Sequence, residues 1–254
     1  MKGKVAIVTG GASGIGWACV EAFAKAGGKS VIADMDVPGG EKAEANLKAA
    51  GLDGLFVKTS VSDPDAVKNL VETTVAKYGR LDILVNNAGM NIPAMFVDVT
   101  EPDVDAMLSL NLRAVILATQ VAARKMLASS RLASMDTAAI VNVTSQMGSV
   151  GAPRRTIYCA TKHGVEGFTK ALAVEFAPLG IRVNAVAPTF ITTPLTDSLF
   201  AKDPSARQWV LDRIPMGRMG NADEVASVIA FLASPAASLI TGESIAVDGG
   251  WTAQ

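Results

Sequence analysis

The chain has 254 residues, of which half are hydrophobic and 19% are charged, so a disordered chain is excluded and a large buried sheet covered by helices is possible. Lys plus Arg total 23 and Asp plus Glu total 24, a balance that disfavours nucleic acid or an anionic membrane as partner and favours small molecules. The two cysteines, Cys19 and Cys159, lack the spacing of a metal site or a disulfide framework. No signal-like segment precedes the first strand and no apolar run reaches spanning length, so we expect a cytoplasmic protein with reduced thiols and no metal.

Short β-branched runs alternate along the chain with longer segments of helical period. Most of these runs are apolar almost throughout, which is typical of strands buried on both faces of a parallel sheet. The alternation predicts right-handed βαβ units, and so a single domain over residues 1–254 with a doubly wound α/β (Rossmann) fold of about seven strands and helices on both faces. In chain order we expect strand 5–8, helix 15–26, strand 30–33, helix 40–50, strand 54–57, helix 64–78, strand 83–85, helix 101–127, strand 140–143, helix 156–177, strand 182–186, helix 222–233 and strand 244–247.

A glycine-rich turn follows the first predicted strand and leads directly into a helix. Glycines let the backbone turn sharply and approach a pyrophosphate, whose charge is stabilised by free N–H groups and by the positive end of the helix dipole. A turn of this composition is also compatible with a plain tight connection, so it favours a dinucleotide only together with other signals. The residues expected to contact the cofactor here are Gly10, Ser13, Gly14, Ile15 and Gly16.

Asp34 ends the second predicted strand, 18 positions after Gly16, which is close to the spacing of roughly 20 at which a carboxylate meets the adenosine ribose of a dinucleotide. The carboxylate can accept hydrogen bonds from both ribose hydroxyls and repels a 2′-phosphate. Ala12, Ser13 and Met35 supply no compensating positive charge. We therefore expect NAD and not NADP, the alternative being a solvated aspartate at the end of a strand.

The order and spacing of further motifs resemble those of the short-chain dehydrogenase/reductase family. The resemblance runs from the first strand to residues 247–250 and covers essentially the whole chain. It implies an oxidoreductase that transfers a hydride to or from nicotinamide. The matching motifs are TGxxxGxG from Thr9 to Gly16, Asn-Asn-Ala-Gly at 86–89, an asparagine at Asn111, a serine at Ser145 and the YxxxK pair Tyr158 and Lys162.

The predicted catalytic residues are Asn111, Ser145, Tyr158 and Lys162. Tyr158 and Lys162 lie four positions apart on a predicted helix, so the phenol and the ammonium share a face. An ordinary tyrosine, with a pKa of about 10, is a poor base at neutrality, but a nearby cation favours its ionised form. Tyr158 can then exchange the hydroxyl proton of the substrate, while Ser145 hydrogen-bonds the substrate oxygen. The resemblance implies that Asn111 supports a water chain to Lys162, and that Lys162 also holds the nicotinamide ribose.

Each catalytic candidate, taken alone, has a structural alternative: a surface aromatic, a solvated cation, a strand-end cap or a buried backbone ligand. Their coincidence on one complete scaffold favours the catalytic interpretation. His163 points about 100° away from Lys162 around the helix and is predicted to be structural, and Cys159 has no neighbour that would activate it. The resemblance adds cofactor contacts from Val61, Asn87, Ala88, Gly89, Tyr158, Lys162, Ile191 and Thr193.

The sequence departs from the family pattern in two places. Ser60 stands where the family often has an aspartate that contacts adenine, which leaves that contact to the backbone of Val61. Thr189 follows Pro188 where the family usually has Pro-Gly. Because a β-branched residue does not readily adopt a positive φ, we expect this loop to differ near the substrate.

Residues 189–216 resemble the family's substrate lid and are called the lid segment below. Their apolar side chains can close over the site and exclude water, or can be ordinary faces of two short helices. Between the serine and the tyrosine lie Gln146, Met147, Arg154 and Arg155, and their side chains can reach the substrate. One of the two arginines is a candidate to bind a carboxylate or a polar sugar group, the alternative being a solvated loop arginine. The apolar residues of the lid segment include Phe190, Leu195, Leu199, Phe200 and Trp209.

The sequence thus predicts an NAD-dependent enzyme that acts on a secondary alcohol or its ketone, such as a polyol, a sugar derivative or a hydroxy acid. Two alternatives stay open: a 3-oxoacyl thioester reductase, which in related sequences usually has NADP and basic residues that are missing here, and a dinucleotide-sensing module without turnover. Family members of this length commonly form tetramers through the helices at 101–127 and 156–177, so we expect a homotetramer.

Overall fold

One parallel sheet of seven strands forms the centre of the protein in the computed structural model, which describes residues 1–128, 138–193, 196–197, 200–201 and 204–254. The strand order is β3-β2-β1-β4-β5-β6-β9, and a small two-stranded sheet joins β7 to β8. The sheet strands are β1 (Val5–Thr9), β2 (Lys29–Asp34), β3 (Gly54–Lys58), β4 (Ile83–Asn86), β5 (Ala138–Val143), β6 (Ile181–Pro188) and β9 (Ser244–Val247), with β7 (Ile191–Thr192) and β8 (Gly220–Asn221) outside it.

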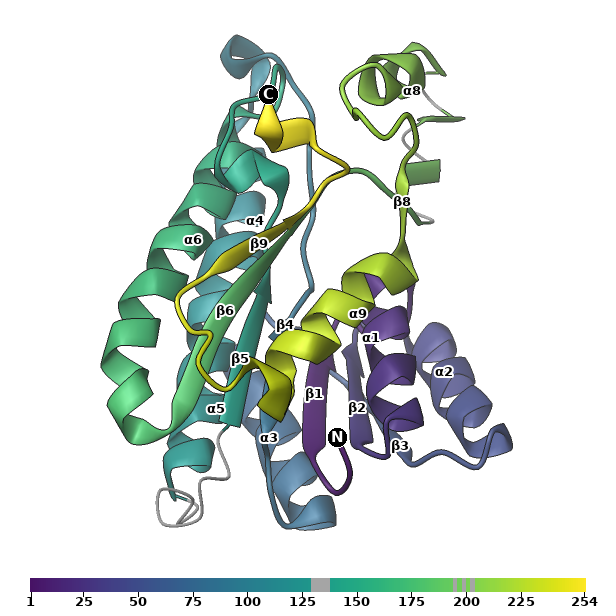
Figure 1. The fold of residues 1–254 in the computed structure, drawn as a ribbon, viewed down its shortest axis with the longest axis vertical. Coiled ribbons are helices and arrows are strands. Elements are labelled where there is room, and N and C mark those ends of the chain that lie inside the picture. Colours follow the sequence, from purple (N-terminus) through teal and green to yellow (C-terminus); the bar gives the residue numbers. More distant parts are fainter. Residues whose placement is uncertain (129–137, 194–195, 198–199, 202–203) are drawn as a thin grey trace.

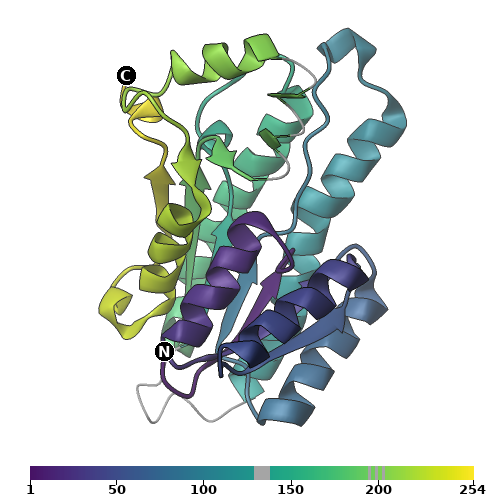
Figure 2. The same ribbon diagram turned by 90° about the vertical axis from the view of Figure 1, so that its right-hand side faces the viewer.

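Helices cover both faces of this sheet, which confirms the predicted doubly wound Rossmann fold (Figures 1 and 2). Helices α1, α2 and α9 pack on one face through side chains such as Phe23, Leu47 and Ile229. Helices α3, α5 and α6 pack on the other through Leu70, Met126 and their neighbours. The helices are α1 (Gly14–Lys25), α2 (Val37–Ala49), α3 (Pro64–Tyr78), α4 (Glu101–Leu108), α5 (Ala114–Ala128), α6 (Thr156–Phe176), α8 (Pro204–Leu211) and α9 (Ala222–Ala233).

Burial along the strands explains their continuous apolar sequence. Every residue of β1, β5 and β6 is buried. Alternate residues of β1 serve opposite layers, since Val5 and Ile7 join the layer with α3 and α5, while Ala6 and Val8 join the layer with α1 and α9. A strand between two helical layers has no solvent face, so polar alternation is absent from the sequence.

Two helices differ from the prediction. Helix α2 begins at Val37 and not at residue 40, because the Asp36 carboxylate accepts a hydrogen bond from Gly39 N at 3.1 Å and caps the helix. The expected helix 101–127 is interrupted by a π-helical turn, Ser109–Arg113. An apolar repeat does not reveal one extra residue in a turn, and such turns are frequent at functional sites.

The helical stretch Glu101–Ala128 is long and apolar enough to cross a membrane by length and composition alone, and 44% of its most apolar window is buried inside the fold. Ala118, Ala122 and Met126 pack there against strand residues such as Ile140 and against α3. This is the behaviour of a core helix.

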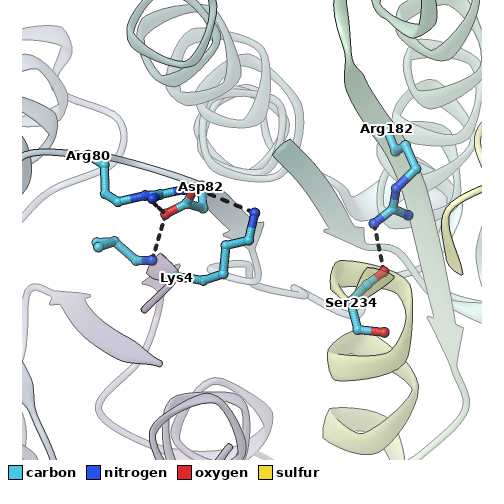
Figure 3. Close-up of polar contacts among 6 residues, drawn as sticks. Lys4, Arg80, Asp82, Arg182 and Ser234 are labelled. Atoms are coloured by element: carbon cyan, nitrogen blue, oxygen red, sulfur yellow. Dashed lines mark hydrogen bonds and ion pairs between the residues drawn. The ribbon is translucent and has the colours of Figure 1, made fainter. Parts of the chain in front are cut away.

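Charged side chains join the elements at the amino ends of the strands (Figure 3). The fully buried Asp82 carboxylate accepts hydrogen bonds from Arg80 Nε and Nη2 at 2.8 and 2.7 Å, and Lys4 Nζ lies 3.9 Å away. On the other side of the sheet, Arg182 of β6 donates to the carbonyl oxygen of Ser234 at 3.1 Å, beside the end of α9. The strand order reverses between β1 and β4. In doubly wound sheets the ligand crevice lies at such a reversal, outside the carboxyl ends of the strands, so a crevice is expected at this edge.

Candidate active site

A cavity of about 570 Å³ lies at the carboxyl edge of the sheet and extends across the ends of β2, β1, β4, β5 and β6. The cavity is lined by most of the predicted cofactor residues and by three of the four predicted catalytic residues. Gly16, Val61 and Asn111 lie outside the lining. The predicted residues in the walls are Gly10, Ser13, Gly14, Ile15, Asp34, Asn87, Ala88, Gly89, Ser145, Tyr158, Lys162, Ile191 and Thr193.

The glycine-rich turn forms a cradle at the start of α1. Gly10 and Gly14 have φ values of +64° and +53°, a conformation that a side chain disfavours. A Cβ on Gly16 would overlap the carbonyl oxygen of Gly10, so Gly16 acts by letting the helix pack on the turn. Ser13 precedes the helix without a side-chain capping bond, and the first turn contains no acidic residue. The first N–H groups of α1 are therefore available for an anion such as a pyrophosphate.

Asn87 fixes this cradle from the end of β4. Its Nδ2 donates to the carbonyl oxygens of Thr9 and Gly10 at 2.9 and 3.2 Å, and its backbone N–H donates to Thr9 Oγ1 at 2.9 Å. Thr9 Oγ1 also accepts from Ala88 N at 3.1 Å. The Asn-Asn-Ala-Gly segment thus holds the first turn in place in addition to lining the cavity.

Asp34 presents a fixed carboxylate to the same cavity. Its Oδ2 accepts from Ala12 N and its Oδ1 from Asp36 N, each at 3.1 Å. These bonds orient the carboxylate without neutralising it, since both donors are uncharged. A backbone cradle at a helix N-terminus, with a carboxylate at the end of the next strand, fits a dinucleotide.

Lys162 and Tyr158 lie together at the start of α6. Lys162 Nζ lies 5.6 Å from the centroid of the Tyr158 ring and donates to the carbonyl oxygen of Val143 at 2.9 Å. Val143 is the last residue of β5, two positions before Ser145. The predicted arrangement of serine, tyrosine and lysine in one cavity is present in the structure.

The sequence led us to expect that Lys162 favours the ionised form of Tyr158, but burial acts against this. Burial raises the pKa of Tyr158 to about 12, a rise that a hydrogen bond with Ser145 only partly offsets. Burial also lowers the pKa of Lys162 to about 8, with Glu166 acting in the opposite direction. Desolvation therefore outweighs the hydrogen bond with Ser145 and the positive charge of Arg155, which both lower the pKa of Tyr158, and the protein alone holds Tyr158 as a neutral acid at pH 7.

Ser145 is held by its neighbours in the sequence. Its Oγ donates to Gln146 Oε1 at 2.8 Å and accepts from Met147 N at 3.2 Å. Gln146 is 1% exposed and lines the cavity. The sequence predicted that Gln146 and Met147 can reach the substrate, and the structure places both in the cavity wall.

Asn111 acts from behind the cavity wall. Its Oδ1 accepts from Met90 N and its Nδ2 donates to Met90 O, both at 2.8 Å, so one amide holds both sides of one residue. Nδ2 also lies 3.4 Å from Thr161 Oγ1 on α6. The π-helical turn positions this side chain, and the loop after β4 is thereby tied to the helix that carries Tyr158.

The lid segment contributes Phe190 to the cavity wall. The Phe190 ring packs against Phe200 and Trp251, with centroids 6.1 and 5.9 Å apart, and Trp209 meets Trp251 edge-on at 5.7 Å. Trp251, close to the C-terminus, is thus part of the lid's apolar cluster, a role the sequence analysis missed. The predicted lid residues Leu195 and Leu199 lie outside the described residues.

Thr189 does not adopt a positive φ, and the predicted difference of this loop from the family's Pro-Gly loop stays a prediction. Among the described residues other than glycine, only Arg154 has a positive φ, and Thr189 N donates to Val247 O at 3.2 Å, which prolongs the pairing of β6 with β9. Arg154 is exposed and Arg155 is partly buried, and neither lines the cavity.

Comparison with known proteins agrees with this geometry. The family model described as enoyl-(acyl carrier protein) reductase matches residues 10–252. The chain is 44% identical to the 3-oxoacyl-[acyl-carrier-protein] reductase FabG of Thermotoga maritima, with 98% of each protein covered. It is 42% identical to the cis-4-hydroxycyclohexanecarboxylate dehydrogenase of Sinomonas cyclohexanicum, with 98% of this chain and 97% of that protein covered.

Among solved structures, the 3-ketoacyl-(acyl-carrier-protein) reductase of Brucella melitensis, complexed with NADH, superposes with a TM-score of 0.90 at 37% identity, covering 99% of each chain. By its sequence, its fold and the residues joined in the cavity, this chain belongs to the short-chain dehydrogenase/reductase family.

Proposed function

We propose that the protein is an NAD-dependent dehydrogenase that interconverts a secondary alcohol and its ketone. One observation carries the proposal: a single cavity is lined both by a dinucleotide cradle with Asp34 and by the group Ser145, Tyr158 and Lys162. A cofactor seated in the cradle and a carbinol at Ser145 would then share one cavity, as hydride transfer requires.

Tyr158 exchanges the proton of the reacting oxygen. In reduction, the neutral phenol donates its proton to the ketone oxygen, and the raised pKa of Tyr158 suits this role. In oxidation the same group removes the hydroxyl proton, which requires additional positive charge near the phenol. Bound oxidised nicotinamide supplies the hydride acceptor and such a charge. Ser145 orients the substrate oxygen, and Lys162 keeps its ammonium beside the Tyr158 ring.

NAD is proposed as the cofactor because of Asp34. Asp34 lines the cavity, and among the described residues its carboxylate is bonded only to the uncharged donors Ala12 N and Asp36 N. A 2′-phosphate at this position would meet an unneutralised negative charge, whereas two ribose hydroxyls would meet an acceptor.

The substrate is proposed to be a polyol, a sugar derivative or a hydroxy acid. The name of the relative that acts on cis-4-hydroxycyclohexanecarboxylate supports a secondary alcohol. Reduction of a 3-oxoacyl thioester is the second candidate, supported by the reductase of Thermotoga maritima. Asp34 disfavours it, because related thioester reductases usually use NADP. A sensing module without turnover is disfavoured by the presence of Asn111, Ser145, Tyr158 and Lys162 together.

A homotetramer in the cytoplasm is proposed as the working form, with small molecules, and neither nucleic acid nor membranes, as partners. Leu108, Leu112 and Ile116 line a surface hollow of about 450 Å³ on α4, the π-helical turn and α5. Leu108 and Ile116 are each 39% exposed, and apolar side chains gathered on one helical face suit a symmetric interface. Sedimentation should give four times the mass of one chain, and a monomer at micromolar concentration would contradict this proposal.

The test of the activity is absorbance of reduced nicotinamide during incubation with NAD or NADP and a panel of secondary alcohols and 3-oxoacyl thioesters. We expect turnover of alcohols with NAD, and a loss of roughly 10²–10⁴-fold in kcat for Tyr158→Phe. Tyr78→Phe is the matched control. Tyr78 ends α3, away from the cavity, and its hydroxyl donates to Asp53 Oδ1 at 2.9 Å. Equal kcat for Tyr158→Phe and the unmodified protein would refute the proposed chemistry.

A further inference from the structure

The loops around the cavity follow the order of the strands in the sheet. Asp34 ends β2, the glycine-rich turn follows β1, and Ser145 follows β5. Phe190, which also lines the cavity, follows β6, the strand that borders β5 on the side away from β1. Because the carboxyl ends of parallel strands lie along the sheet edge in strand order, Phe190 lies beyond Ser145 as seen from the cofactor cradle. At this end of the cavity, a substrate held at Ser145 extends away from the cofactor.

Phe190 and Ile191 serve opposite sides of the chain after β6. Ile191 is buried in the core layer with α1 and α9, whereas Phe190 packs into the apolar cluster of the lid segment. The chain then returns to the cradle, since a Cβ on Gly14 would lie 3.3 Å from Thr193 Cγ2. Phe190 is therefore the residue of this stretch whose side chain joins the cavity wall to the lid's apolar cluster.

Trp251 packs against Phe190 from outside the cavity. The two ring centroids are 5.9 Å apart, and the ring planes are inclined by 33°. Among the described residues Trp251 is not part of the cavity lining, whereas Phe190 is. Trp251 follows β9, the edge strand beside β6, so it supports the Phe190 ring from the side opposite the cofactor cradle. A substrate in the cavity would therefore meet Trp251 through the Phe190 ring and not directly.

The C-terminal turn that carries Trp251 is fixed by hydrogen bonds. The Asp248 carboxylate accepts from Thr252 N at 2.9 Å and from Thr252 Oγ1 at 2.6 Å, which closes the turn around Trp251. Gly249 O accepts from Met216 N at 3.1 Å, at the end of the lid segment. Trp251 is therefore held both by its own turn and by the lid segment, as a group that positions another side chain should be.

We propose that Trp251 is a positioning residue that holds the Phe190 ring in the cavity wall and thereby sets the size of the group that the protein accepts beyond the reacting carbon of its substrate. The inference rests on the proposed function and deepens it, because it says which residues limit the substrate. Ser145 and Tyr158 bind the reacting oxygen, and Phe190, supported by Trp251, bounds the space beyond it.

Loss of the Trp251 indole removes this support. The structure around a deleted large side chain relaxes in part, and neighbouring groups move into the space that is left. The Phe190 ring would then withdraw from the cavity, which would admit a larger substrate. Asp34 and the glycine-rich turn lie at the other end of the cavity, so the affinity for the dinucleotide should not change.

The test compares kcat/KM with NAD for pairs of secondary alcohols that differ in bulk, namely cyclohexanol with 4-tert-butylcyclohexanol and 2-butanol with 2-octanol. In each pair, the ratio of the larger to the smaller alcohol measures the space beyond the reacting carbon. In Trp251→Ala we expect at least one ratio to rise by about tenfold, the effect of one or two additional methylene groups accommodated in an apolar pocket. Trp251→Phe keeps an aromatic ring behind Phe190 and should keep both ratios within about twofold of the original values.

A double-mutant cycle tests whether Trp251 acts through Phe190. Phe190→Ala should itself raise the ratios, and the addition of Trp251→Ala to it should change them by less than about twofold. Trp251→Leu, which keeps an apolar side chain in the cluster, gives the same comparison in case Trp251→Ala does not fold. Phe23→Leu is the control for lost stability, because Phe23 is buried in the layer with α1 and α9, and it should leave both ratios unchanged.

Three results overturn the inference while the dehydrogenase activity stands. The first is that the ratios in Trp251→Ala, or in Trp251→Leu, match those of the unmodified protein. The second is an equal effect of the Trp251 substitution with the Phe190 ring present and absent. The third is a loss of NADH affinity, measured by fluorescence titration, as large as the change in the ratios, because Trp251 would then support the cofactor end of the cavity. Absence of NAD-linked turnover with every alcohol in the unmodified protein instead overturns the proposed function, and the inference with it.

Discussion

Lys162 donates a hydrogen bond to the carbonyl oxygen of Val143 at 2.9 Å, and this bond ties the helix that carries Tyr158 to the strand that ends before Ser145. This contact between α6 and β5 places Tyr158 and Lys162 beside the segment that carries Ser145, whose own hydroxyl is held by Gln146 and Met147. Lys162 is 5% exposed, and burial lowers its pKa to about 8. A buried ammonium at this position supports the active site but lowers the stability of the fold, a common compromise in enzymes.

Replacing Lys162 by Met should therefore stabilise the protein and inactivate it. At pH 7 the free energy of unfolding should rise by about 2 kcal/mol, because holding the buried ammonium costs about 3 kcal/mol and its hydrogen bond returns about 1 kcal/mol. In the folded protein the pKa of Lys162 is about 8, and in the unfolded chain it has its ordinary value of 10.5. Between pH 8 and pH 10.5 the unfolded chain therefore binds more protons at this residue than the folded protein does. The unmodified protein thus becomes more stable as the pH rises through this window, and the advantage of Lys162→Met should shrink.

Urea denaturation at pH 7 and at pH 10 measures this difference. Lys170→Met, an exposed position eight residues further along α6, should change stability little and equally at both pH values. A Lys162→Met protein less stable than the unmodified one at pH 7 would show that the hydrogen bond to Val143 outweighs the desolvation of the ammonium.

Asp34 should determine the choice between NAD and NADP. In Asp34→Ala the unneutralised carboxylate and its bonds to Ala12 N and Asp36 N are lost. We expect the KM for NAD to rise about tenfold, the effect of losing one or two charge-assisted hydrogen bonds, while the KM for NADP falls or stays constant. Steady-state kinetics with both cofactors measures the ratio.

Asp36→Ala is the control for this experiment. Asp36 is exposed and caps α2 by accepting from Gly39 N at 3.1 Å. Its loss should reduce stability by about 1 kcal/mol and leave the preference between NAD and NADP unchanged. The assignment of Asp34 fails if both variants shift the cofactor preference alike.

The strand pattern and the motifs were sufficient to predict the sheet, its helical layers and most of the cavity. Val5 to Val8 and the residues of β5 and β6 are apolar because they lie between two helical layers, and that cause is visible in the sequence. The glycine spacing likewise predicted the cradle, because glycine adopts the positive φ of Gly10 and Gly14 without the strain that a side chain adds.

Other features depend on contacts between distant segments and left no local signal. The π-helical turn around Asn111 adds a residue without changing the apolar pattern, so an uninterrupted helix was expected. Trp251 joins the lid cluster only through the tertiary fold. The pKa of Tyr158 depends on how deeply the phenol is buried, and the spacing to Lys162 indicates a neighbouring cation but not the amount of desolvation.

Gly16 should tolerate no side chain. A Cβ there would overlap the carbonyl oxygen of Gly10 and lie 2.7 Å from Asn87 Nδ2, so Gly16→Ala forces the glycine-rich turn away from α1. We expect a loss of about 1–3 kcal/mol of stability, as for other overpacked sites, together with weakened binding of NAD. Thermal unfolding and fluorescence titration with NADH measure the two effects.

Gly167→Ala separates this clash from the general effect of alanine in a helix. Gly167 lies on α6 with no atom within 4 Å of a built Cβ. Its replacement should stabilise the protein by about 0.5–1 kcal/mol, because alanine has the higher helix propensity, and should leave NADH binding intact. The steric explanation for Gly16 would be wrong if the two alanine variants bound NADH equally well.

Asn111 should affect the substrate side of the cavity more than the cofactor side. Asn111→Ala leaves the N–H and carbonyl of Met90 without their partners, so we expect about 2–3 kcal/mol lower stability and a fall in kcat/KM of about tenfold or more as the loop after β4 loses its fixed position. NADH affinity should change little, because Asn87 and Thr9 hold the glycine-rich turn independently of Asn111. Ser109→Ala, on the same π-helical turn, is the control and should leave both parameters near their original values. If Asn111→Ala weakens NADH binding as strongly as it lowers kcat/KM, the π-helical turn supports the whole cavity and not the substrate loop in particular.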